Sequence, residues 1–364
     1  MKVFFIAIIG AYIAGNTYVF IRTMQMMQSC GVWWRMLVGV AFWTVAFSMI
    51  ISMFLRGVEL PIAVQKAMFN IGAVWMVFTL YMVLALMAVD IAKIFIPTMR
   101  GGYLYALGVT TLLLAYGYYN YRHPKIVNLE IAIDKPITGG NTRVVAVSDI
   151  HLGNGTDKRA LQRYVEMINS QQPDAIIIGG DLIDNSLTPV RQQRMEEELR
   201  KLQAPQGIYM VAGNHEYISR IDECEKFLQH TPIQLLRDSV VTLTNGIQIV
   251  GRDDRSNRDR LSLSQLLCNT DAAKPIIVID HQPYNIAEAN AAGIDLQFSG
   301  HTHRGQVWPL NLLTDYIYEQ SHGYRKWSKA HIYVSSGLSL WGPPFRIGTN
   351  SDMVVFDIKS TAKE

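Results

Sequence analysis

The stretch VVAVSDIH at residues 144–151 combines the two features that decide the fold and the chemistry of this chain. Four apolar residues, the composition of a buried strand, lead directly into Asp149 and His151. Alternating residues at a strand end can point the same way, so both side chains can serve one site. The same order, an apolar run followed by Asp, His or Asn, recurs further along the chain.

Four later blocks repeat these ligand-type side chains. They are GGDLID (179–184), GNHE (213–216), DHQP (280–283) and GHTH (300–303). Carboxylate, imidazole and amide oxygen suit divalent cations, and two adjacent cations need one ligand that bridges them. A lone histidine is more often a core or surface residue, but five blocks together predict a two-metal site of the kind that acts on phosphate esters.

Short apolar runs alternate with helical patterns in the second part of the chain, which predicts an α/β domain. We expect strands at residues 144–147, 176–178, 208–211, 276–279 and 295–298, and helices at 159–169, 190–202, 220–229 and 285–292. Residues 242–250, interrupted by Asn245 and Gly246, predict a hairpin with a tight turn. Because the ligand blocks follow strands, we expect their side chains to meet at one rim of a sheet.

The first third of the chain has the composition of a membrane region. Residues 1–121 hold seven basic and two acidic residues, which leaves 26 basic and 28 acidic residues for 122–364. Four apolar runs, at residues 3–21, 32–55, 67–95 and 101–119, are near the roughly 20 residues that cross a bilayer as a helix. The sequence thus predicts a four-span region over 1–121 and a soluble domain over 122–364. The near-neutral soluble part indicates no nucleic-acid partner.

An even number of spans places the N-terminus and the soluble domain on one side of the membrane. Five basic residues flank the spans on that side and four on the other, so the positive-inside rule favours the cytoplasmic side of a bacterial inner membrane. The two sets are Lys2, Arg56, Lys66, Arg122 and Lys125, against Arg22, Arg35, Lys93 and Arg100. The first run could instead be a signal peptide, but it lacks a clear small-residue cleavage site. Asp90, the one acid inside a span, is expected to pair with Lys93.

The five blocks resemble the successive signatures of the calcineurin-like metallophosphoesterase family: DxH, GDxxD, GNH with an acid next, an isolated His, and GHxH. The resemblance covers residues 143–357. It implies an α/β (α+β) fold, an αββα sandwich of two mixed sheets flanked by helices, with two divalent metal ions at the strand ends. Mn²⁺ is the first expectation, with Fe, Zn or Mg as alternatives. Carried over block by block, the resemblance assigns Asp149, His151 and His303 to one ion, Asn214, His281 and His301 to the other, and Asp181 to both.

The resemblance also implies roles in catalysis. A water shared by the two ions would ionise near neutral pH and attack the phosphorus in line. His215 resembles the family histidine that protonates the leaving oxygen or stabilises the transition state, and Asp184 would orient it and favour its protonated form. The alternatives are an exposed loop residue for His215 and a helix N-cap for Asp184.

Arginines in three segments are candidate substrate contacts. Arg304 directly follows GHTH, where relatives often have Gly, and it could hold a substrate phosphate or simply lie on the surface. Arg255 or Arg258, in the segment RDDRSNRDR (252–260), could clamp a second phosphate, although such charged segments are usually solvated loops. Arg346 ends GPPFR, which resembles a stretch that membrane-associated members of the family carry near the active site.

The membrane region also bears on the substrate. Apolar residues in segments 307–318 and 338–345 suit an acyl chain or the bilayer surface, or pack under loops. An enzyme anchored in the bilayer meets a lipid-linked substrate in two dimensions, so we expect a phosphoesterase or pyrophosphatase acting on a phosphorylated lipid. The alternatives are a tethered hydrolase of soluble phosphodiesters or nucleotides, and a non-catalytic receptor or scaffold that retains the metal-binding domain. The scattered Cys30, Cys224 and Cys268 predict no disulfide framework, and no oligomeric state is indicated.

Overall fold

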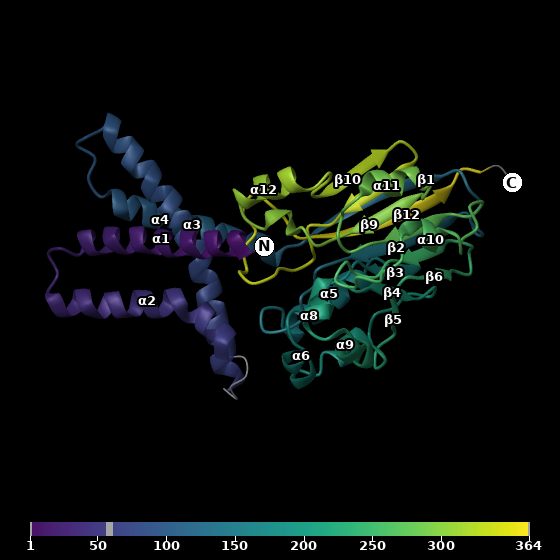
Figure 1. The fold of residues 1–364 in the computed structure, drawn as a ribbon, viewed down its shortest axis with the longest axis horizontal. Coiled ribbons are helices and arrows are strands. Elements are labelled where there is room, and N and C mark those ends of the chain that lie inside the picture. The colour runs from purple at the N-terminus through teal and green to yellow at the C-terminus, as the bar shows by residue number, and fades with distance from the viewer. Residues whose placement is uncertain (1, 56–60, 363–364) are drawn as a thin grey trace. The chain divides into compact units, whose positions relative to one another are not determined.

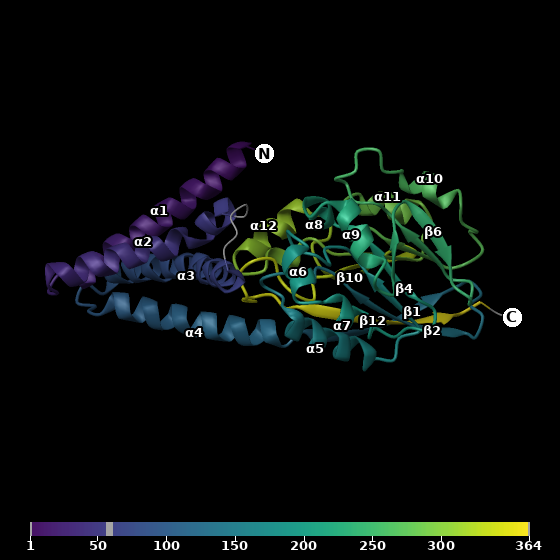
Figure 2. The same cartoon turned by 90° about the horizontal axis from the view of Figure 1, so that it is seen from below.

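The computed structural model describes residues 2–55 and 61–362, which fall into two units (Figures 1 and 2). One unit runs to Tyr119 and includes the later segment Gly342–Ile347, whereas the other begins at Asn120 and lacks that segment. Arg56 and Glu59, which enter the charge count above, lie outside the described residues.

Within residues 2–55 and 61–122, the structure contains four helices, and each coincides with one of the predicted apolar runs. They are α1 (Lys2–Met26), α2 (Val32–Phe54), α3 (Ile62–Phe95) and α4 (Gly102–Arg122). Among the described residues, α2 and α3 are the helices that are long and apolar enough to cross a membrane, by length and composition. That α1 and α4 also cross stays a prediction.

Polar side chains fix α1 against α3. The Arg22 Nη1 atom donates to both carboxylate oxygens of Asp90, at 2.7 and 2.6 Å. The expected partner, Lys93, was therefore wrong, because a neighbouring helix supplies a closer cation than the next turn of α3. Deeper in the unit, the buried Asn16 accepts a hydrogen bond from Trp75 Nε1 at 2.8 Å. A polar group in an apolar interior needs such a partner, so these pairs help to set the register of the two helices.

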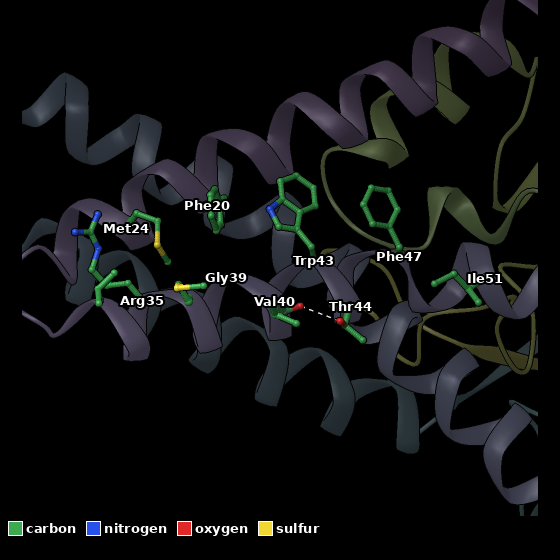
Figure 3. Close-up of a pocket in the computed structure, with 11 residues that line it drawn as sticks. Phe20, Met24, Arg35, Gly39, Val40, Trp43, Thr44, Phe47 and Ile51 are labelled. Atoms are coloured by element: carbon green, nitrogen blue, oxygen red, sulfur yellow. Dashed lines mark hydrogen bonds between the residues drawn. The ribbon is translucent and has the colours of Figure 1, made fainter.

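An apolar groove of about 850 Å³ is formed by side chains of α1 and α2 (Figure 3). Phe20 from α1 and Trp43 and Phe47 from α2 are among its lining residues, and Arg35 lies at one end. The lining is hydrocarbon and aromatic along most of its length, which favours contact with lipid over contact with water.

The second unit contains two six-stranded mixed sheets, which confirms the predicted fold class. The first has the order β1-β12-β2-β3-β4-β5, with bounds Lys125–Ile133, Asp352–Ser360, Asn141–Val147, Ala175–Ile178, Ile208–Val211 and Ile233–Leu236. The second has the order β10-β11-β9-β8-β7-β6, with bounds Gly323–Trp327, Ala330–Val334, Leu296–Ser299, Ile276–Ile279, Gln248–Gly251 and Ser239–Thr242. Strands β2, β3 and β4 run parallel to one another, as do β7, β8 and β9.

Helices cover the outer faces of both sheets. They are α5 (Lys158–Asn169), α6 (Thr188–Gln192), α7 (Glu196–Leu199), α8 (Asn214–Ile218), α9 (Ile221–Leu228), α10 (Leu263–Leu267), α11 (Ile286–Ala291) and α12 (Leu310–Ile317), with a 3₁₀ turn, η2 (His303–Gly305). Buried side chains of α5, α6, α7 and α9 pack against the first sheet, and those of α10 and α11 against the second. Between the sheets, Phe298 and Phe356 are fully buried in a shared core. Strands covered on both faces read as continuous apolar runs, which explains why β3 and β8 were visible in the sequence.

Most predicted elements of this unit are present, with two differences. The predicted helix at 190–202 is split into α6 and α7, because Arg194 between them has a left-handed backbone (φ 51°) that no α-helix contains. The predicted hairpin is confirmed as β6 and β7, but residues 243–247 form a loop longer than a two-residue turn. The predictions missed the strands β1, β5, β10, β11 and β12 and the helices α8, α10 and α12.

Candidate metal centre

The candidate ligands all lie just beyond the carboxyl ends of parallel strands. Asp149 and His151 follow β2, Asp181 follows β3, Asn214 follows β4, His281 follows β8, and His301 and His303 follow β9. Both sheets contribute, so residues far apart in sequence arrive at a common rim. This is the gathering of ligand blocks that the sequence predicted.

The side chains form three overlapping groups whose ligating atoms lie within 4.8 Å of one another in each group. The groups are Asp149, His151 and His303; His151, Asp181 and His215; and Asp181, His281 and His301. Because Asp181 and His151 each belong to two groups, the arrangement is one extended cluster rather than separate sites.

His281 tests whether a cation fits the second part of this cluster. Its Nδ1 atom lies 2.7 Å from the carbonyl oxygen of Gly179, which can only accept, so Nδ1 carries the proton in the neutral ring. The Nε2 lone pair then faces Asp181 Oδ2 at 3.2 Å and Asn214 Oδ1 at 3.3 Å. In the neutral ring, three acceptors converge there, and a divalent cation would satisfy all of them. Without a cation, burial lowers the pKa of His281 but the Asp181 and Asp149 carboxylates raise it well above its usual value, so a proton on Nε2 takes the place of the cation. A backbone carbonyl that orients a ligand imidazole is the usual second partner of a metal-binding histidine.

The first part of the cluster fits a cation for a similar reason. The Nε2 atoms of His151 and His303 lie 3.1 Å apart, and His303 Nε2 lies 3.4 Å from Asp149 Oδ1. The two rings stack at 5.1 Å, so both present a ring nitrogen toward the same carboxylate. Donors of this type at this spacing suit Mn²⁺, Fe²⁺ or Zn²⁺. Two such ions would supply Lewis acidity toward a phosphoryl group and lower the pKa of a bound water.

The buried carboxylates of this cluster need nearby positive charge to stay ionised. Burial raises the pKa of Asp149, and the nearby Asp181 carboxylate adds to the effect. Burial alone would also raise the pKa of Asp181, but His281 and His151 outweigh it and lower the pKa. The pKa of His301 falls to about 4 because it is buried beside His281, so its imidazole is neutral and able to act as a ligand at neutral pH.

The backbone at these positions is held in an uncommon conformation. Left-handed φ values occur at Asp149 (55°), His151 (49°), Asp181 (51°), His301 (71°) and His303 (46°). Each costs of order 1 kcal/mol for a residue with a Cβ, and such costs concentrate at functional sites. Two signature glycines permit the close packing: a Cβ on Gly213 would overlap Asp181, and one on Gly300 would overlap Asp149.

Glu216 is a structural residue of the site whose role the sequence analysis missed. Its buried carboxylate accepts hydrogen bonds from the backbone N–H groups of Asp181 (2.9 Å), Ile183 (2.9 Å) and Gly213 (2.7 Å). It therefore ties the loop after β3 to the start of α8. Burial and the Asp181 charge raise the pKa of Glu216 to about 7 although these N–H donors favour its charged form. The available signal was the acid that directly follows GNH.

His215 lies inside the cluster and contacts Asp184. Its Nδ1 atom lies 2.9 Å from the Asp184 carbonyl oxygen and 3.4 Å from Asp184 Oδ1. Burial by itself lowers the pKa of His215, but Asp184 and Asp181 raise it to about 9. Against the effect of burial, hydrogen bonds with His151 and then His215 hold the pKa of Asp184 at about 2. The alternative readings are wrong, because His215 is 8% exposed and the residue that precedes α6 is Leu187.

The three candidate arginines lie in different surroundings. Arg255 is exposed, and its guanidinium lies 4.6 Å from the centre of the Tyr284 ring. Arg304 belongs to the η2 turn and lines a pocket whose other lining residues include none of the candidate ligands. Arg346 is fully buried in the segment Gly342–Ile347, where its backbone N–H donates to the Gly117 carbonyl at 2.9 Å.

The charged segment 252–260 is only partly the solvated loop that its composition indicated. Arg252 is buried and pairs with Asp280 at 2.9 Å, and Arg260 lies 3.3 Å from the same carboxylate. Asp253 is also buried, at 3.0 Å from Arg237. Asp280 of the DHQP block thus pairs with both arginines, which leaves His281 as the ligand-type residue of that block.

Exposed apolar side chains lie close to the cluster on two sides. Trp341 is 43% exposed, and its ring centre lies 6.2 Å from that of His215. On the other side, a Cβ on Gly305 would overlap the backbone of Leu310, so α12 begins tightly against the η2 turn. Tyr318, which follows α12, lies 6.3 Å from the His301 ring. The outward side chains of α12 include Leu312, 58% exposed, and Tyr316, 88% exposed. Of the two alternatives for segments 307–318 and 338–345, both occur: some of their apolar side chains are exposed and others are buried.

Known proteins are similar in sequence to a large part of this chain. The family model for calcineurin-like phosphoesterases matches residues 142–305. An uncharacterized metallophosphoesterase from Helicobacter pylori is 32% identical over 71% of this chain and 72% of its own length. A transmembrane protein with metallophosphoesterase domain from Danio rerio is 31% identical over 70% of this chain and 62% of its own length. A solved dimetal phosphatase from Danio rerio aligns with 56% of this chain and 88% of its own at 12% identity and a TM-score of 0.36, a weaker likeness. This chain belongs to the calcineurin-like metallophosphoesterase family.

Proposed function

We propose that this chain is a phosphoesterase that uses two divalent metal ions sharing Asp181. The proposed ligands are Asp149, His151 and His303 for one ion and Asn214, His281 and His301 for the other. The observation that carries the proposal is the overlap of the ligand groups at Asp181, each group lying within 4.8 Å. Mn²⁺ is the proposed metal, with Fe, Zn and Mg as alternatives, because the donors are carboxylate, amide and imidazole without thiolate.

His215 is proposed as the proton donor to the leaving oxygen. It lies beside the candidate ligands His151 and Asp181, and Asp184 accepts from its Nδ1 side and leaves Nε2 for the substrate. The contacts of Asp184 with the ring support a positioning role and favour the protonated imidazole that a general acid requires.

The proposed substrate is a phosphorylated lipid or lipid-linked phosphate. Support comes from the exposed apolar side chains beside the cluster, Trp341 near His215 and those of α12 near His301. Apolar surface next to a phosphate site suits a substrate whose phosphate carries a hydrocarbon group. Arg255 is the proposed contact for a further anionic group. Its ring partner Tyr284 lies 5.0 Å from Tyr318, which in turn neighbours His301. For Arg346 a phosphate contact stays a prediction.

The membrane association of this enzyme is proposed to be a four-span anchor in a bacterial inner membrane, with the catalytic domain in the cytoplasm. The apolar helices α2 and α3 and relatives named as transmembrane proteins support the association itself. The number of spans and the side rest on the apolar runs and the distribution of basic residues.

Metal-dependent hydrolysis is the first test. Full-length protein in detergent should hydrolyse an aryl phosphomonoester or phosphodiester with added Mn²⁺ and not with excess chelator. Asp181→Asn should lose most activity and bound metal, because a shared carboxylate is replaced by a weaker neutral donor. Asp222→Asn, an exposed acid on α9, is the matched control and should keep both. Full metal occupancy without hydrolysis of any phosphate ester would contradict the proposal and favour the scaffold alternative.

A second test separates lipid substrates from soluble ones. Leu312→Ser and Tyr316→Ser should raise KM for a lipid phosphate in mixed micelles and leave hydrolysis of a soluble aryl phosphate unchanged, because both side chains are exposed and neither belongs to the ligand groups. An exposed polar substitution elsewhere, Gln162→Ser on α5, serves as the control. Equal effects on both substrates, or none on either, would favour a soluble phosphodiester or nucleotide.

A further inference from the structure

A pocket separate from the metal cluster lies behind the η2 turn. It has a volume of about 220 Å³ and is lined by Lys125, Arg304, His322, Ser336 and Asp352, among other residues. That volume is far above the roughly 30 Å³ share of one liquid water, so the pocket has room for a polyatomic ion. None of the candidate metal ligands lines it.

The Arg304 side chain, which lines this pocket, has a hydrogen-bond donor without an acceptor. Its Nε atom is buried and has no hydrogen-bond partner. A buried, unsatisfied donor on a charged group is destabilising, so an arginine at this position is unfavourable unless a ligand accepts its hydrogen bond. The backbone of Arg304 is also left-handed (φ 50°), which adds a conformational cost that glycine would avoid.

The charges around Arg304 favour an anion. Within the described residues neither Arg304 nor Lys125 makes an ion pair, and Lys125 adds a second positive charge at the pocket wall. The acid of the pocket, Asp352, already accepts from Tyr333 Oη at 2.8 Å, Ser335 Oγ at 2.5 Å and the Ser336 N–H at 3.1 Å. Its carboxylate is therefore saturated by other donors, and the remaining cationic donors of the pocket point to a missing acceptor.

We propose that this pocket binds a phosphate group through Arg304, with Lys125 and His322 as further donors. A phosphate has three or more acceptor oxygens and can take hydrogen bonds from several sides at once, as a guanidinium, an ammonium and an imidazole provide. The site stands apart from the proposed hydrolysis, because it uses no metal ligand.

The pocket shares a wall with the metal cluster. Arg304 directly follows His303, and Ser336 directly precedes Gly337. A Cβ on Gly337 would lie 2.9 Å from the Asp149 Cβ and 3.2 Å from His303 Nδ1, so this backbone is in close contact with two candidate ligands. A phosphate bound on Arg304 would thus brace the turn that carries His303.

Phosphate binding by metal-stripped, full-length protein in detergent tests the proposal. Calorimetric titration with inorganic phosphate, against chloride at matched ionic strength, should show one site in the parent. Arg304→Gln should weaken the affinity at least about tenfold, the loss expected for a charge-assisted contact. Arg163→Gln, an exposed arginine on α5 outside the pocket, should leave it unchanged. Because the protein has been stripped of metal, it cannot hydrolyse a phosphate ester in this experiment. A failure to bind phosphate is therefore distinguishable from a failure of the proposed activity.

The Lys125→Gln variant tests the same pocket independently, in case the Arg304→Gln variant does not fold. The Lys125 side chain is exposed, so its replacement should leave the fold intact and weaken phosphate binding by less than the Arg304 change. Short-chain phosphatidic acid, titrated below its micelle concentration, separates a lipid headgroup from free phosphate as the source: tighter binding of the lipid assigns the headgroup, and equal or weaker binding assigns free phosphate. No binding of either by the parent, or equal binding by Arg304→Gln, would overturn the proposal.

Discussion

At the scale of single residues, the surroundings of His215 change the pKa of its imidazole. A histidine in solution is half protonated near pH 6.5, whereas Asp184 and Asp181 raise the pKa of His215 to about 9. The signature GNHE identified the residue, but its charge state depends on a carboxylate 31 positions earlier in the chain.

Replacing His215 tests its role as a proton donor. His215→Ala should lower kcat by about 10²–10⁴-fold, the usual contribution of a positioned general acid. Bound metal should stay near the parent level, because the proposed ligand set does not include His215. Activity assays paired with metal analysis of the same preparations make the comparison. A loss of metal in proportion to activity would instead make His215 a ligand.

The pH dependence of catalysis should respond to Asp184. A raised histidine pKa means that the protonated ring is present below that pKa and is lost as pH rises through it. Asp184→Asn removes one of the two carboxylates that raise the pKa, so the alkaline limb of the kcat profile should move to lower pH. Measuring kcat from pH 6 to 10 checks the shift, with Asp222→Asn as the control. An unmoved alkaline limb would show that His215 does not act through its protonated form.

At the scale of elements, the site depends on loops that follow strands and on the contacts that hold those loops. Apolar runs at β2, β3, β4, β8 and β9 were predictable, because strands buried on both faces are continuous in hydrophobicity. The loops were not predictable in detail. The left-handed backbone at Asp149 and Asp181, and the three hydrogen bonds to Glu216, depend on contacts between segments distant in sequence.

Glu216 should be a main determinant of the stability of this loop pair. Glu216→Ala leaves the N–H groups of Asp181, Ile183 and Gly213 buried without an acceptor. At about 1–3 kcal/mol each, the loss should reach at least about 3 kcal/mol, or a fall in Tm of roughly 6 °C or more for a domain of this size. Thermal unfolding of the detergent-solubilised protein provides the measurement. Glu166→Ala, an exposed acid on α5, should change Tm by no more than about 1–2 °C. A similarly small change for Glu216→Ala would contradict the role.

At the scale of the whole molecule, two units of opposite solvent preference share one chain. The first consists of helices in which apolar side chains are widely exposed, and the second has two sheets with a buried core. The composition break near residue 121 and the division of the described chain between Tyr119 and Asn120 lie close together. The number of membrane crossings decides whether the second unit lies on the same side of the membrane as the N-terminus.

The cysteines can count the crossings. Cys30, between α1 and α2, and Cys268, after α10, are exposed, whereas Cys224 is buried and burial raises its pKa to about 12. Four spans place Cys30 and Cys268 on opposite sides of the membrane, while crossings by α2 and α3 alone place them on the same side. For a cytoplasmic catalytic domain, a membrane-impermeant maleimide added to spheroplasts should label Cys30 and leave Cys268 protected until lysis. Cys30→Ser and Cys268→Ser identify the labelled sites. Equal labelling of both from outside would exclude the four-span arrangement.

Local pattern alone determined much of this protein: the apolar runs of the helices and central strands, and the identity of the Asp, His and Asn residues that follow those strands. These properties reside in consecutive residues, so hydrophobicity and side-chain type suffice to read them. The tertiary structure decided that Asp90 pairs with Arg22, that Asp280 pairs with two arginines, that Glu216 joins two loops, and that Arg304 lines a pocket to which no candidate metal ligand contributes. Each of these depends on which distant segment lies opposite, and that is set only when the helices and sheets pack around a common core.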